Sequence, residues 1–329
     1  MQVEAERPSV SVVMCTFNGE RFVAEQLESI LNQTVLPDEI IISDDGSSDS
    51  TLAVIDNVRQ ASELAVRWDI QTRASPLGPA KNFESALKRA TGDVIALADQ
   101  DDVWVPHKLE VLLGRVVGTN GALLVHSDAL LTDELGRPGS TLMKALWLTR
   151  GERRSLVSGN ALRALLRRNL VTGATVILAK ELRDAAAPIP DNWLHDEWLG
   201  LVAALHGGLV FEQSKLVHYR QHAGNVIGAQ QLQPSVARWR LAESRVEFYG
   251  RKARRNDALA ALIHADPNWL GPEDRNFLQE KVDFDVSRAA LPRRHLARVW
   301  PILRWVFLGR YRDFARGWID VFRDFSLTP

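Results

Sequence analysis

The chain has 329 residues, of which 46% are hydrophobic and 25% are charged, and its formal net charge is −1. This length suits one large domain or one domain with an appendage, and the composition is that of a globular protein. The single cysteine, Cys15, excludes an internal disulfide and a cysteine-based zinc cluster. We expect Cys15 in a buried strand of a protein from a reducing compartment.

The charge is unevenly distributed along the chain. Residues 231–329 contain 18 Lys and Arg against 12 Asp and Glu, a net charge of +6, which leaves −7 for residues 1–230. This asymmetry predicts two functional parts. The segment MQVEAERPSV is polar and acidic, unlike a signal peptide, and no apolar run reaches the roughly 18 residues of a membrane span. We therefore expect a cytoplasmic protein, or one that is peripheral on the inner face of the cell membrane.

The first hundred residues alternate β-rich runs with helical patterns, which indicates a parallel sheet covered by helices. Residues 9–16 and 38–45 read as strands, with a helix between them from Val23 to Leu31 and Asn18 as its N-cap. The pattern continues as a helix over 51–60 capped by residues 47–49, a strand over 65–72, a helix over 79–90 and a strand over 92–98. Later residues predict a strand over 172–179, a helix over 195–207 and mostly helix beyond 230.

An acidic segment follows the fourth predicted strand. ALADQDDVW, residues 96–104, places Asp99, Asp101 and Asp102 directly after an apolar run. Three carboxylates this close repel one another unless water or a cation relieves the repulsion. Considered without the rest of the sequence, the three aspartates could belong to a solvated acidic loop. However, open α/β sheets bind ligands at the carboxyl ends of their strands, and SDDGS at residues 43–47 ends another strand of the same sheet.

The order of these motifs resembles the nucleotide-sugar-dependent family 2 glycosyltransferases. The matching segments are TFNG, a helix ending in NQT, DDGSSD, Gly78 followed by KN, ATGDVIALAD and DQDD; they cover residues 9–110 densely, with scattered points up to about 228. The resemblance implies an α/β protein of the GT-A fold, a Rossmann-like mixed sheet with helices on both faces, followed by a helical C-terminal region. We expect a catalytic domain over residues 1–230, with a donor-binding half over 9–128 and an acceptor half over 129–230. Residues 231–329 would form the helical region.

The resemblance also assigns roles to the acidic residues. It makes Asp99 and Asp101 an Asp-x-Asp signature, with Asp99 on the ribose or a metal-bound water and Asp101 on a divalent metal ion, Mn²⁺ or Mg²⁺, that bridges the two phosphates. Asp102 would support them. Clustered carboxylates suit such hard cations. Asp44 would contact the nucleobase, and a turn-forming Asp before Gly46 is the structural alternative.

Further donor contacts follow from the same resemblance. Thr16 and Asn18 are expected to line the nucleobase pocket, and Lys81 to lie near the pyrophosphate. The alternatives are a helix cap for Asn18 and a solvent-facing helix residue for Lys81. From the segment YRQHAGNVIG, Arg220 or Gln221 would hold the leaving diphosphate.

The acceptor side needs a base, because an inverting transfer removes a proton from the acceptor hydroxyl on the side opposite the leaving group. NWLHDEWLG matches the acidic motif of the family except that His195 stands in place of the first Glu. Asp196 is therefore the predicted base and Glu197 the runner-up, while an acidic first helix turn stabilised by the helix dipole is the structural alternative. His222 is the predicted third metal ligand, since neutral imidazole completes carboxylate sites.

The C-terminal segment combines aromatic and basic residues. Residues 286–329 contain nine Arg and three Asp. Aromatic residues repeat there at helical spacing at Tyr311, Phe314, Trp318, Phe322 and Phe325, with Trp300, Trp305 and Phe307 upstream. This pattern is typical of helices in an anionic membrane interface, and packing on the catalytic domain or on a second subunit of a homo-oligomer is the alternative. Nucleic acid is not an expected partner, because the acidic N-terminal part would oppose a phosphate backbone.

These features predict an inverting, metal-dependent glycosyltransferase. ALADQDDVW together with YRQHAGNVIG most resembles bacterial rhamnosyltransferases of O-antigen and other surface polysaccharide synthesis, which implies dTDP-L-rhamnose as donor and a lipid-linked glycan as acceptor. UDP-hexose and UDP-N-acetylhexosamine donors stay open. A catalytically silent nucleotide-sugar-binding scaffold is the alternative from another class. A nucleotidyltransferase is disfavoured because TFNGER offers one Gly where a phosphate loop needs several.

Overall fold

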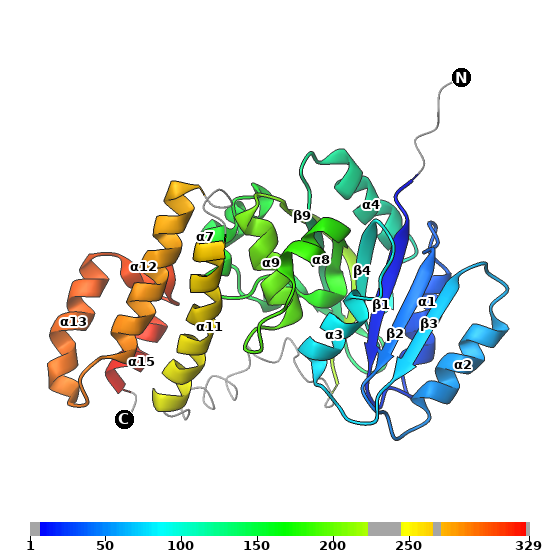
Figure 1. Ribbon diagram of the computed structural model, residues 1–329, viewed down its shortest axis with the longest axis horizontal. Coiled ribbons are helices and arrows are strands. Elements are labelled where there is room, and N and C mark those ends of the chain that lie inside the picture. Colours follow the sequence, from blue (N-terminus) through cyan, green and yellow to red (C-terminus); the bar gives the residue numbers. More distant parts are fainter. Residues whose placement is uncertain (1–6, 223–244, 266–270, 327–329) are drawn as a thin grey trace. The chain divides into compact units, whose positions relative to one another are not determined.

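The computed structural model describes residues 7–222, 245–265 and 271–326 (Figure 1). The chain divides into two compact units. One comprises Met1–Asn160 and Val171–Ala229, and the other comprises Ala161–Leu170 and Gln230–Pro329. A short segment from the middle of the sequence therefore belongs to the C-terminal unit.

The first unit alternates strands and helices as the sequence predicts. Its first part contains β1 (Val10–Thr16), α1 (Val23–Leu31), β2 (Glu39–Asp44), α2 (Thr51–Ala61), β3 (Arg67–Thr72), α3 (Pro79–Leu87) and β4 (Val94–Asp99). Its second part contains β5 (Val103–Trp104), α4 (Lys108–Gly118), β6 (Leu124–Thr132), β7 (Pro138–Thr141), α5 (Leu142–Ala145), α6 (Arg150–Val157), a 3₁₀ turn η1 (Gly173–Thr175), β8 (Val176–Ala179), α8 (Lys180–Ala186), α9 (His195–Leu205) and β9 (Leu209–Arg220).

One mixed sheet organises the described part of this unit, in the order β3-β2-β1-β4-β8-β6-β9-β5 with β7 paired to β6. Strands β1 to β4 are parallel, and β8 runs antiparallel to both β4 and β6. Strand β1 lies between β2 and β4, so the connections leave it in opposite directions, and the carboxyl ends of all three strands meet at one edge. There, Thr16 pairs in register with Asp44, and Cys15 pairs with Asp99.

Apolar residues bury both faces of the sheet. Val10, Val12 and Met14 of β1 belong to a core cluster with Leu27 and Ile30 of α1. Side chains alternate along a strand, so the intervening residues of β1 point to the opposite face. That face is covered by α3, while α1 and α2 lie on the other side (Figure 1). Cys15 lies in β1 as expected, although it is only half-buried.

The second unit is helical, which confirms the expected helical C-terminal region. It contains α7 (Leu162–Leu165), α11 (Arg245–Ala265), α12 (Pro272–Ala289), α13 (His295–Phe307), α14 (Arg310–Phe314) and α15 (Trp318–Ser326). Within the residues that the structure describes, none of these helices is long and apolar enough to cross a membrane.

Buried charges and aromatic rings hold this unit together. Arg288 of α12 is fully buried, and its Nε donates to Asp324 Oδ2 of α15 at 2.5 Å. The hydroxyls of Tyr249 and Tyr311 donate to the same carboxylate, and Phe284 packs edge-on against Tyr311 with ring centroids 5.3 Å apart. A buried charge requires partners, and these contacts join α11, α12, α14 and α15.

The C-terminal aromatic residues divide into two sets. Tyr311 and Phe314 of α14 are buried in the core of the unit, whereas Trp318 and Phe322 of α15 are 76% and 62% exposed. Gly317, with a φ of 60°, lies between the two helices. The aromatic residues from Tyr311 to Phe325 therefore do not lie on one side of a single helix: the chain turns at Gly317, and of these residues Tyr311 and Phe314 are buried whereas Trp318 and Phe322 face solvent.

Candidate functional site

The acidic segment lies at the carboxyl edge of the sheet, as predicted. Asp99 is the last residue of β4 and is half-buried. Loss of solvent raises the pKa of Asp99 to about 7, and the charges of Asp101 and Asp196 contribute to the increase. The structure therefore brings the predicted base close to the predicted Asp-x-Asp signature, although the two are far apart in sequence.

Asp101 and His222 are also brought together. Asp101 Oδ2 lies 2.8 Å from His222 Nε2, and both side chains are largely buried. The imidazole of His222 packs against the ring of Phe22, with centroids 4.9 Å apart. The contact joins the segment that follows β9 to the segment that follows β4.

Asp102 turns into the protein. It is fully buried, and its Oδ1 accepts a hydrogen bond from the backbone N–H of Arg220 at 3.0 Å. Its Oδ2 is buried without a hydrogen-bond partner among the described residues. Burial, and next the charges of Asp101 and Asp99, raise the pKa of Asp102 well above its usual range. Asp102 therefore supports the turn from inside.

Lys108, at the start of α4, is a cation near the acidic residues that sequence reasoning missed. Its side chain is fully buried, its Nζ donates to the carbonyl of Ala174 at 2.7 Å, and the ammonium lies 3.5 Å from the centre of the Trp104 ring. Burial lowers the pKa of Lys108 well below its usual value, and the charges of Asp102 and Asp99 oppose that decrease. No local pattern in the sequence indicated this position, because Trp104 ends β5 and Lys108 begins α4.

Gln100, between Asp99 and Asp101, was also missed. Its Oε1 accepts from the backbone N–H of Phe17 at 2.9 Å, and its Nε2 donates to the Phe17 carbonyl at 3.1 Å. A Cβ at Gly19 would lie 2.2 Å from Gln100 Oε1, so a larger residue there would displace the Gln100 side chain from these hydrogen bonds. These contacts hold the end of β4 against the segment after β1.

Asp196 lies in the first turn of α9. Its Oδ2 accepts a hydrogen bond from the backbone N–H of Gly173 at 3.1 Å, and its Oδ1 accepts from Glu197 N–H at 2.7 Å. The carboxylate is half-buried, whereas Glu197 is 8% exposed. Asp196 also acts electrostatically on Asp99. The charge of the predicted base thus reaches the acidic residues.

His195 packs beneath this turn. Its ring stacks on Phe83 of α3 with centroids 3.9 Å apart, and neither ring nitrogen has a hydrogen-bond partner within the described ranges. Burial lowers the pKa of His195 to about 3, so the imidazole is neutral. A Cβ at Gly173 would lie 2.8 Å from His195 Nε2. The close approach of Gly173 is what allows its N–H to reach Asp196.

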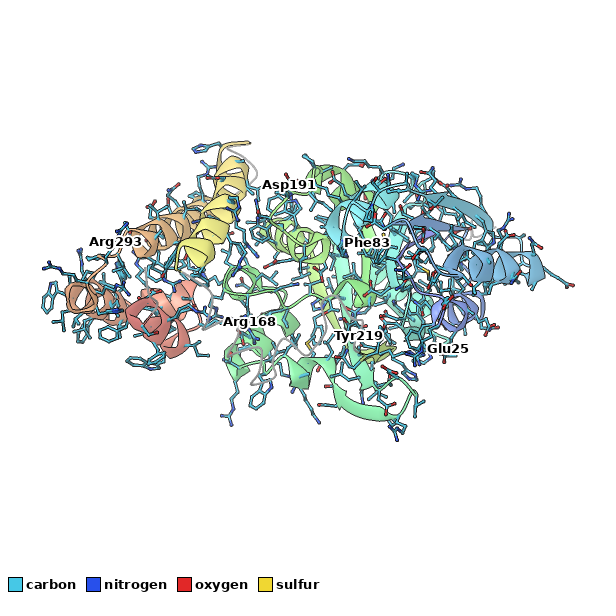
Figure 2. All side chains as sticks on the ribbon, turned by 90° about the horizontal axis from the view of Figure 1, so that it is seen from below. Glu25, Phe83, Arg168, Asp191, Tyr219 and Arg293 are labelled. Carbon is cyan, nitrogen blue, oxygen red and sulfur yellow. The ribbon has the colours of Figure 1, made fainter. Side chains whose placement is uncertain are left out.

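Tyr219 of β9 is a further residue that sequence reasoning missed, and it is labelled in Figure 2. It is 6% exposed, and burial raises the pKa of its hydroxyl well above the usual value. Four carboxylates add to this increase, those of Asp99, Asp102, Asp101 and Asp196. The acidic side chains therefore surround one end of β9, which no local pattern in the sequence indicated.

Arg220 and Gln221 contact protein atoms. The Nε of Arg220 donates to the carbonyl of Asp101 at 2.9 Å, its Nη1 donates to the carbonyl of Glu134 at 3.0 Å, and its Nη2 pairs with the carboxylate of Glu25. Gln221 Nε2 donates to the Arg220 carbonyl at 3.3 Å. In this geometry Arg220 holds the backbone of the acidic segment in place.

Asp44 and Thr16 lie together at the ends of β2 and β1. Asp44 is fully buried and accepts from Thr16 Oγ1 at 2.8 Å, from Thr72 Oγ1 at 3.0 Å and from the backbone N–H of Ser47 at 2.8 Å. The turn-forming role that the sequence left open for Asp44 is therefore present. Contact with a nucleobase stays a prediction.

Asn18 does not cap α1, contrary to expectation. The helix begins at Val23, its N-cap residue is Phe22, and the carbonyl of Gly19 accepts the N–H groups of both. The side chain of Asn18 instead accepts from the backbone N–H of Ser48 at 2.9 Å. Asn18 has a φ of 48°, a conformation that asparagine tolerates better than most residues. It therefore joins the ends of β1 and β2.

Lys81 of α3 is bound by neighbouring oxygens. Its Nζ lies 2.9 Å from Glu84 Oε2, 2.9 Å from Asp191 Oδ1 and 2.9 Å from the Ile189 carbonyl. Hydrogen bonds to Asp191 and Glu84 raise the pKa of Lys81. It thus links α3 to the segment before α9 and is not a freely solvated lysine.

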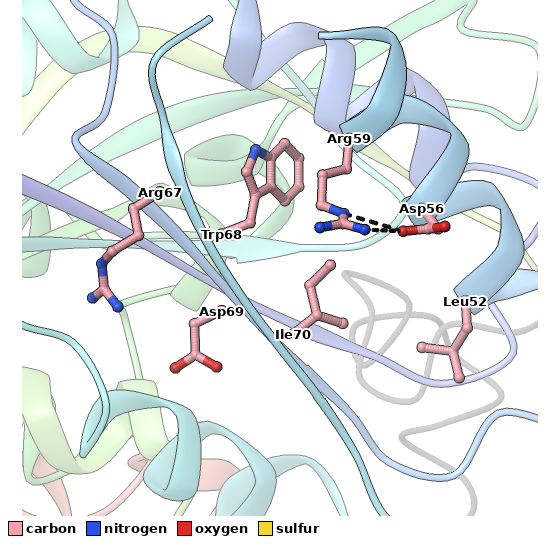
Figure 3. Close-up of a pocket in the computed structure, with 7 residues that line it drawn as sticks. All are labelled: Leu52, Asp56, Arg59, Arg67, Trp68, Asp69 and Ile70. Carbon is pink, nitrogen blue, oxygen red and sulfur yellow. Dashed lines mark hydrogen bonds and ion pairs between the residues drawn. The ribbon is translucent and has the colours of Figure 1, made fainter.

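An open pocket of about 730 Å³ lies elsewhere in this unit, between α2 and β3 (Figure 3). It is lined by Leu52, Asp56, Arg59, Arg67, Trp68, Asp69 and Ile70. Figure 3 shows Arg59 paired with Asp56 on one side and Trp68 between the two arginines. None of the predicted site residues lines this pocket.

The side chains at the carboxyl edge fit a divalent metal by their chemistry. Carboxylate oxygens and an imidazole nitrogen are ligands that Mn²⁺ accepts, and Mg²⁺ prefers oxygen. Among the described residues, no group of three His, Cys, Asp or Glu side chains already lies close enough to hold a metal ion. However, the unpartnered Oδ2 of Asp102 and the raised pKa of Asp99 indicate negative charge that protein atoms compensate only in part. A cation near Asp99, Asp101 and His222 would compensate it.

Comparison with known proteins shows that the N-terminal region is similar to glycosyltransferases. Residues 11–144 match the family model described as glycosyl transferase family 2. Over 139 residues the chain is 32% identical to the putative glycosyltransferase EpsE of Bacillus subtilis (strain 168), covering 42% of this chain and 49% of that protein. It is also 32% identical over 111 residues to the UDP-Glc:alpha-D-GlcNAc-diphosphoundecaprenol beta-1,3-glucosyltransferase WfgD of Escherichia coli, covering 34% of this chain and 42% of WfgD. The chain thus spans half or less of the length of these relatives.

A solved structure extends the similarity to nearly the whole chain. The mannosyltransferase PcManGT from Pyrobaculum calidifontis, in complex with GDP-Man and Mn²⁺, superposes with a TM-score of 0.54 at 16% identity, covering 97% of this chain and 86% of that one. At this identity the likeness concerns the fold.

Proposed function

Because residues 11–144 of this chain belong to glycosyl transferase family 2 and its fold is the expected GT-A fold, we propose that the protein transfers a sugar from a nucleoside-diphosphate sugar to a glycan acceptor, with inversion. The observation that carries the proposal is the approach of Asp196 and His222 to Asp99 and Asp101 at the carboxyl edge of the sheet. This arrangement joins the groups for donor binding and for proton removal in one unit.

The donor side of the proposal uses the ends of β1, β2 and β4. Asp99, Asp101 and His222 would hold Mn²⁺ or Mg²⁺. The bound metal would neutralise the diphosphate and so help it to leave. Asp102 and Lys108 support these side chains from inside the protein, where Lys108 offsets part of the negative charge.

Other donor contacts are proposed from the positions of the residues in the first unit. Asp44, Thr16 and Asn18 would face the nucleobase, at the ends of β1 and β2. Lys81, Arg220 and Gln221 would reach the diphosphate, although each now contacts protein atoms that a diphosphate would have to replace. Arg220 contributes in any case by holding the backbone of Asp101.

Asp196 is the proposed base. A carboxylate takes the proton of the acceptor hydroxyl while the diphosphate leaves from the other side of the sugar. The N–H groups of Gly173 and Glu197 hold its two oxygens, which fixes the position of a carboxylate whose charge acts on Asp99. Glu197 is the runner-up, but it is more buried.

For the donor we propose dTDP-L-rhamnose, with UDP-hexose and UDP-N-acetylhexosamine as the alternatives. The rhamnose assignment rests on the resemblance of ALADQDDVW and YRQHAGNVIG to bacterial rhamnosyltransferases. The name of WfgD describes a UDP-Glc donor and an acceptor linked to diphosphoundecaprenol. This similarity supports a lipid-linked acceptor, and it also supports UDP-hexose as the alternative donor. The proposed setting is bacterial surface polysaccharide synthesis, such as O-antigen, at the inner face of the cell membrane.

A thermal-shift screen tests the proposal. Nucleoside diphosphates and their sugars are added with Mn²⁺, with Mg²⁺ and with a chelator. A ligand at 100 times its dissociation constant stabilises the folded state by about 2.7 kcal/mol, so the melting temperature is expected to rise with one nucleoside diphosphate only when metal is present. Nucleoside monophosphates and metal alone are the controls. The absence of a shift with every nucleoside diphosphate and nucleotide sugar would contradict the proposal.

A further inference from the structure

The helices α13 and α15 of the C-terminal unit share a large apolar surface. Its main members, called here the α13–α15 face, are Leu296, Trp300, Phe307, Trp318, Ile319 and Phe322. On α13 the spacing of residues 296, 300, 303 and 307 follows one side of a helix, and residues 318, 322 and 325 do the same on α15. Trp300 is 79% exposed and Phe307 is 87% exposed.

The two helices are fixed to each other, so the face is a stable surface. Arg298 of α13 is fully buried, and its Nη1 donates to the carbonyls of Asp324 and Phe325 at 3.2 Å each. His295 Nδ1 lies 2.7 Å from the carbonyl of Phe325. These contacts hold the ends of α13 and α15 together from inside, while Trp300, Phe307 and Trp318 are exposed to solvent.

Arginines dominate the exposed charge of the segment that carries this face. Between residues 291 and 326 the exposed charged side chains are all arginines: Arg293, Arg294, Arg304, Arg312 and Arg316. Two of the three carboxylates of this segment, Asp320 and Asp324, are buried beside Arg288 and Arg323, and the third, Asp313, is partly exposed and pairs with Arg312. Arg293 is labelled in Figure 2 among the C-terminal helices.

Aromatic side chains flanked by arginines match the chemistry of one kind of partner. A monomeric soluble protein rarely exposes a contiguous apolar surface of this kind without a partner. Tryptophan and phenylalanine enter the boundary between headgroups and acyl chains, and arginines beside them attract anionic lipid. A two-fold contact with a second copy would bring the same arginines against each other, which opposes self-association.

We propose that the α13–α15 face docks the protein on an anionic lipid surface, with both helices lying in the plane of the interface. The proposal goes beyond sugar transfer and does not depend on it, because every residue that carries it belongs to the C-terminal unit. It also explains why the sequence concentrates arginine after residue 286 while the rest of the chain is acidic.

Co-sedimentation with vesicles tests this docking. The full chain is mixed with vesicles of phosphatidylcholine alone or of phosphatidylcholine with phosphatidylglycerol, at salt from about 0.05 M to about 0.5 M, across which the screening length falls severalfold. Binding is expected only to the anionic vesicles and is expected to weaken as salt rises. Failure to bind the anionic vesicles at low salt would overturn the proposal.

Matched variants locate the surface. Trp318→Ser with Phe322→Ser, and separately Arg293→Glu with Arg294→Glu, are each expected to weaken vesicle binding by at least about tenfold. The controls are Leu135→Ser, at a position that is 75% exposed, and Arg153→Glu with Arg154→Glu, an exposed pair on α6. An equal loss in the controls would overturn the assignment to this face.

Two further measurements keep the test decisive. Acyl-chain-brominated lipid is expected to quench the tryptophan fluorescence of the unaltered protein, a result that needs no variant to fold.

Light scattering is expected to show that the protein is a monomer. If it instead shows a dimer, and the double variant Trp318→Ser with Phe322→Ser is a monomer, lipid docking would be overturned in favour of self-association. The metal-dependent thermal shift with nucleoside diphosphates should persist in these variants, so failure of docking and failure of the proposed transfer are distinguishable.

Discussion

Asp101 and His222 meet across the end of the sheet, with Oδ2 and Nε2 2.8 Å apart, although 121 positions separate them in sequence. One belongs to the segment that follows β4 and the other directly follows β9. Arg220 strengthens the connection, because its Nε donates to the backbone carbonyl of Asp101. The donor-binding half of the sheet is thereby tied to the last strand of the first unit.

Asp101→Asn is expected to abolish metal-dependent nucleotide binding while leaving the protein folded. The substitution keeps the shape of the side chain but removes the charge that a divalent cation requires. Calorimetric titration with UDP and dTDP, with and without Mn²⁺, measures the effect. Asp56→Asn, an exposed carboxylate on α2, is the control and should bind as the unaltered protein does. Unchanged manganese-dependent affinity in Asp101→Asn would refute the metal assignment.

Asp196→Asn is expected to lower turnover by at least about 100-fold, the usual effect of removing a general base. Affinity for the donor should change little, because the substitution keeps the shape of the side chain and the amide oxygen can still accept one of the two backbone hydrogen bonds, from Gly173 or from Glu197. Steady-state kinetics with the donor found in the screen measures both quantities. If Glu197→Gln loses activity and Asp196→Asn does not, the role of base passes to Glu197.

Lys108→Met is expected to destabilise the protein by about 1–3 kcal/mol, since it leaves the buried Ala174 carbonyl without its donor. It also removes a cation that favours ionised Asp99 and Asp102, so the pKa of Asp99 should rise further. In the unaltered protein Asp99 already holds a proton in the folded state but not in the unfolded state from about pH 4 to about pH 7, so stability falls as the pH rises. A higher pKa extends this window upward, so the loss of stability relative to the unaltered protein is expected to be larger at pH 8 than at pH 5. Urea unfolding at pH 5 and pH 8 tests this, with the exposed Lys144→Met as control.

Part of the acid sensitivity of the first unit is expected to come from His126. This side chain of β6 is fully buried, neither ring nitrogen has a hydrogen-bond partner among the described residues, and burial lowers its pKa to about 3. The unfolded state therefore binds a proton below about pH 6.5 that the folded state does not, so stability falls as the pH falls, by about 1.4 kcal/mol per pH unit.

His126→Leu should remove that dependence between about pH 6 and pH 4. The measurement is the free energy of unfolding in urea at both pH values, compared with that of the unaltered protein. His218→Leu, at an exposed position of β9, serves as the control and should keep the acid-induced loss. A pH dependence in His126→Leu equal to that of the unaltered protein would show that His126 is not its source.

Local pattern in the sequence was sufficient for the order of elements up to β4 and for the place of Asp99 at a strand end. The spacing of apolar residues determines which side of a strand or helix is buried, and it depends on neighbours in sequence only. The start of α9 at His195, and hence the position of Asp196 in its first turn, followed from the same kind of signal.

Only the tertiary structure decided what lies beside these elements. It buried Lys108 behind the acidic segment, engaged the guanidinium of Arg220 with protein oxygens, and placed Tyr219 among four carboxylates. It also separated Tyr311, which enters the core, from Trp318, which faces solvent, although both fit the same helical spacing. The physical reason is that burial and charge depend on which distant segments pack together, and contacts between residues far apart in the chain leave no periodic signal in the sequence around either one.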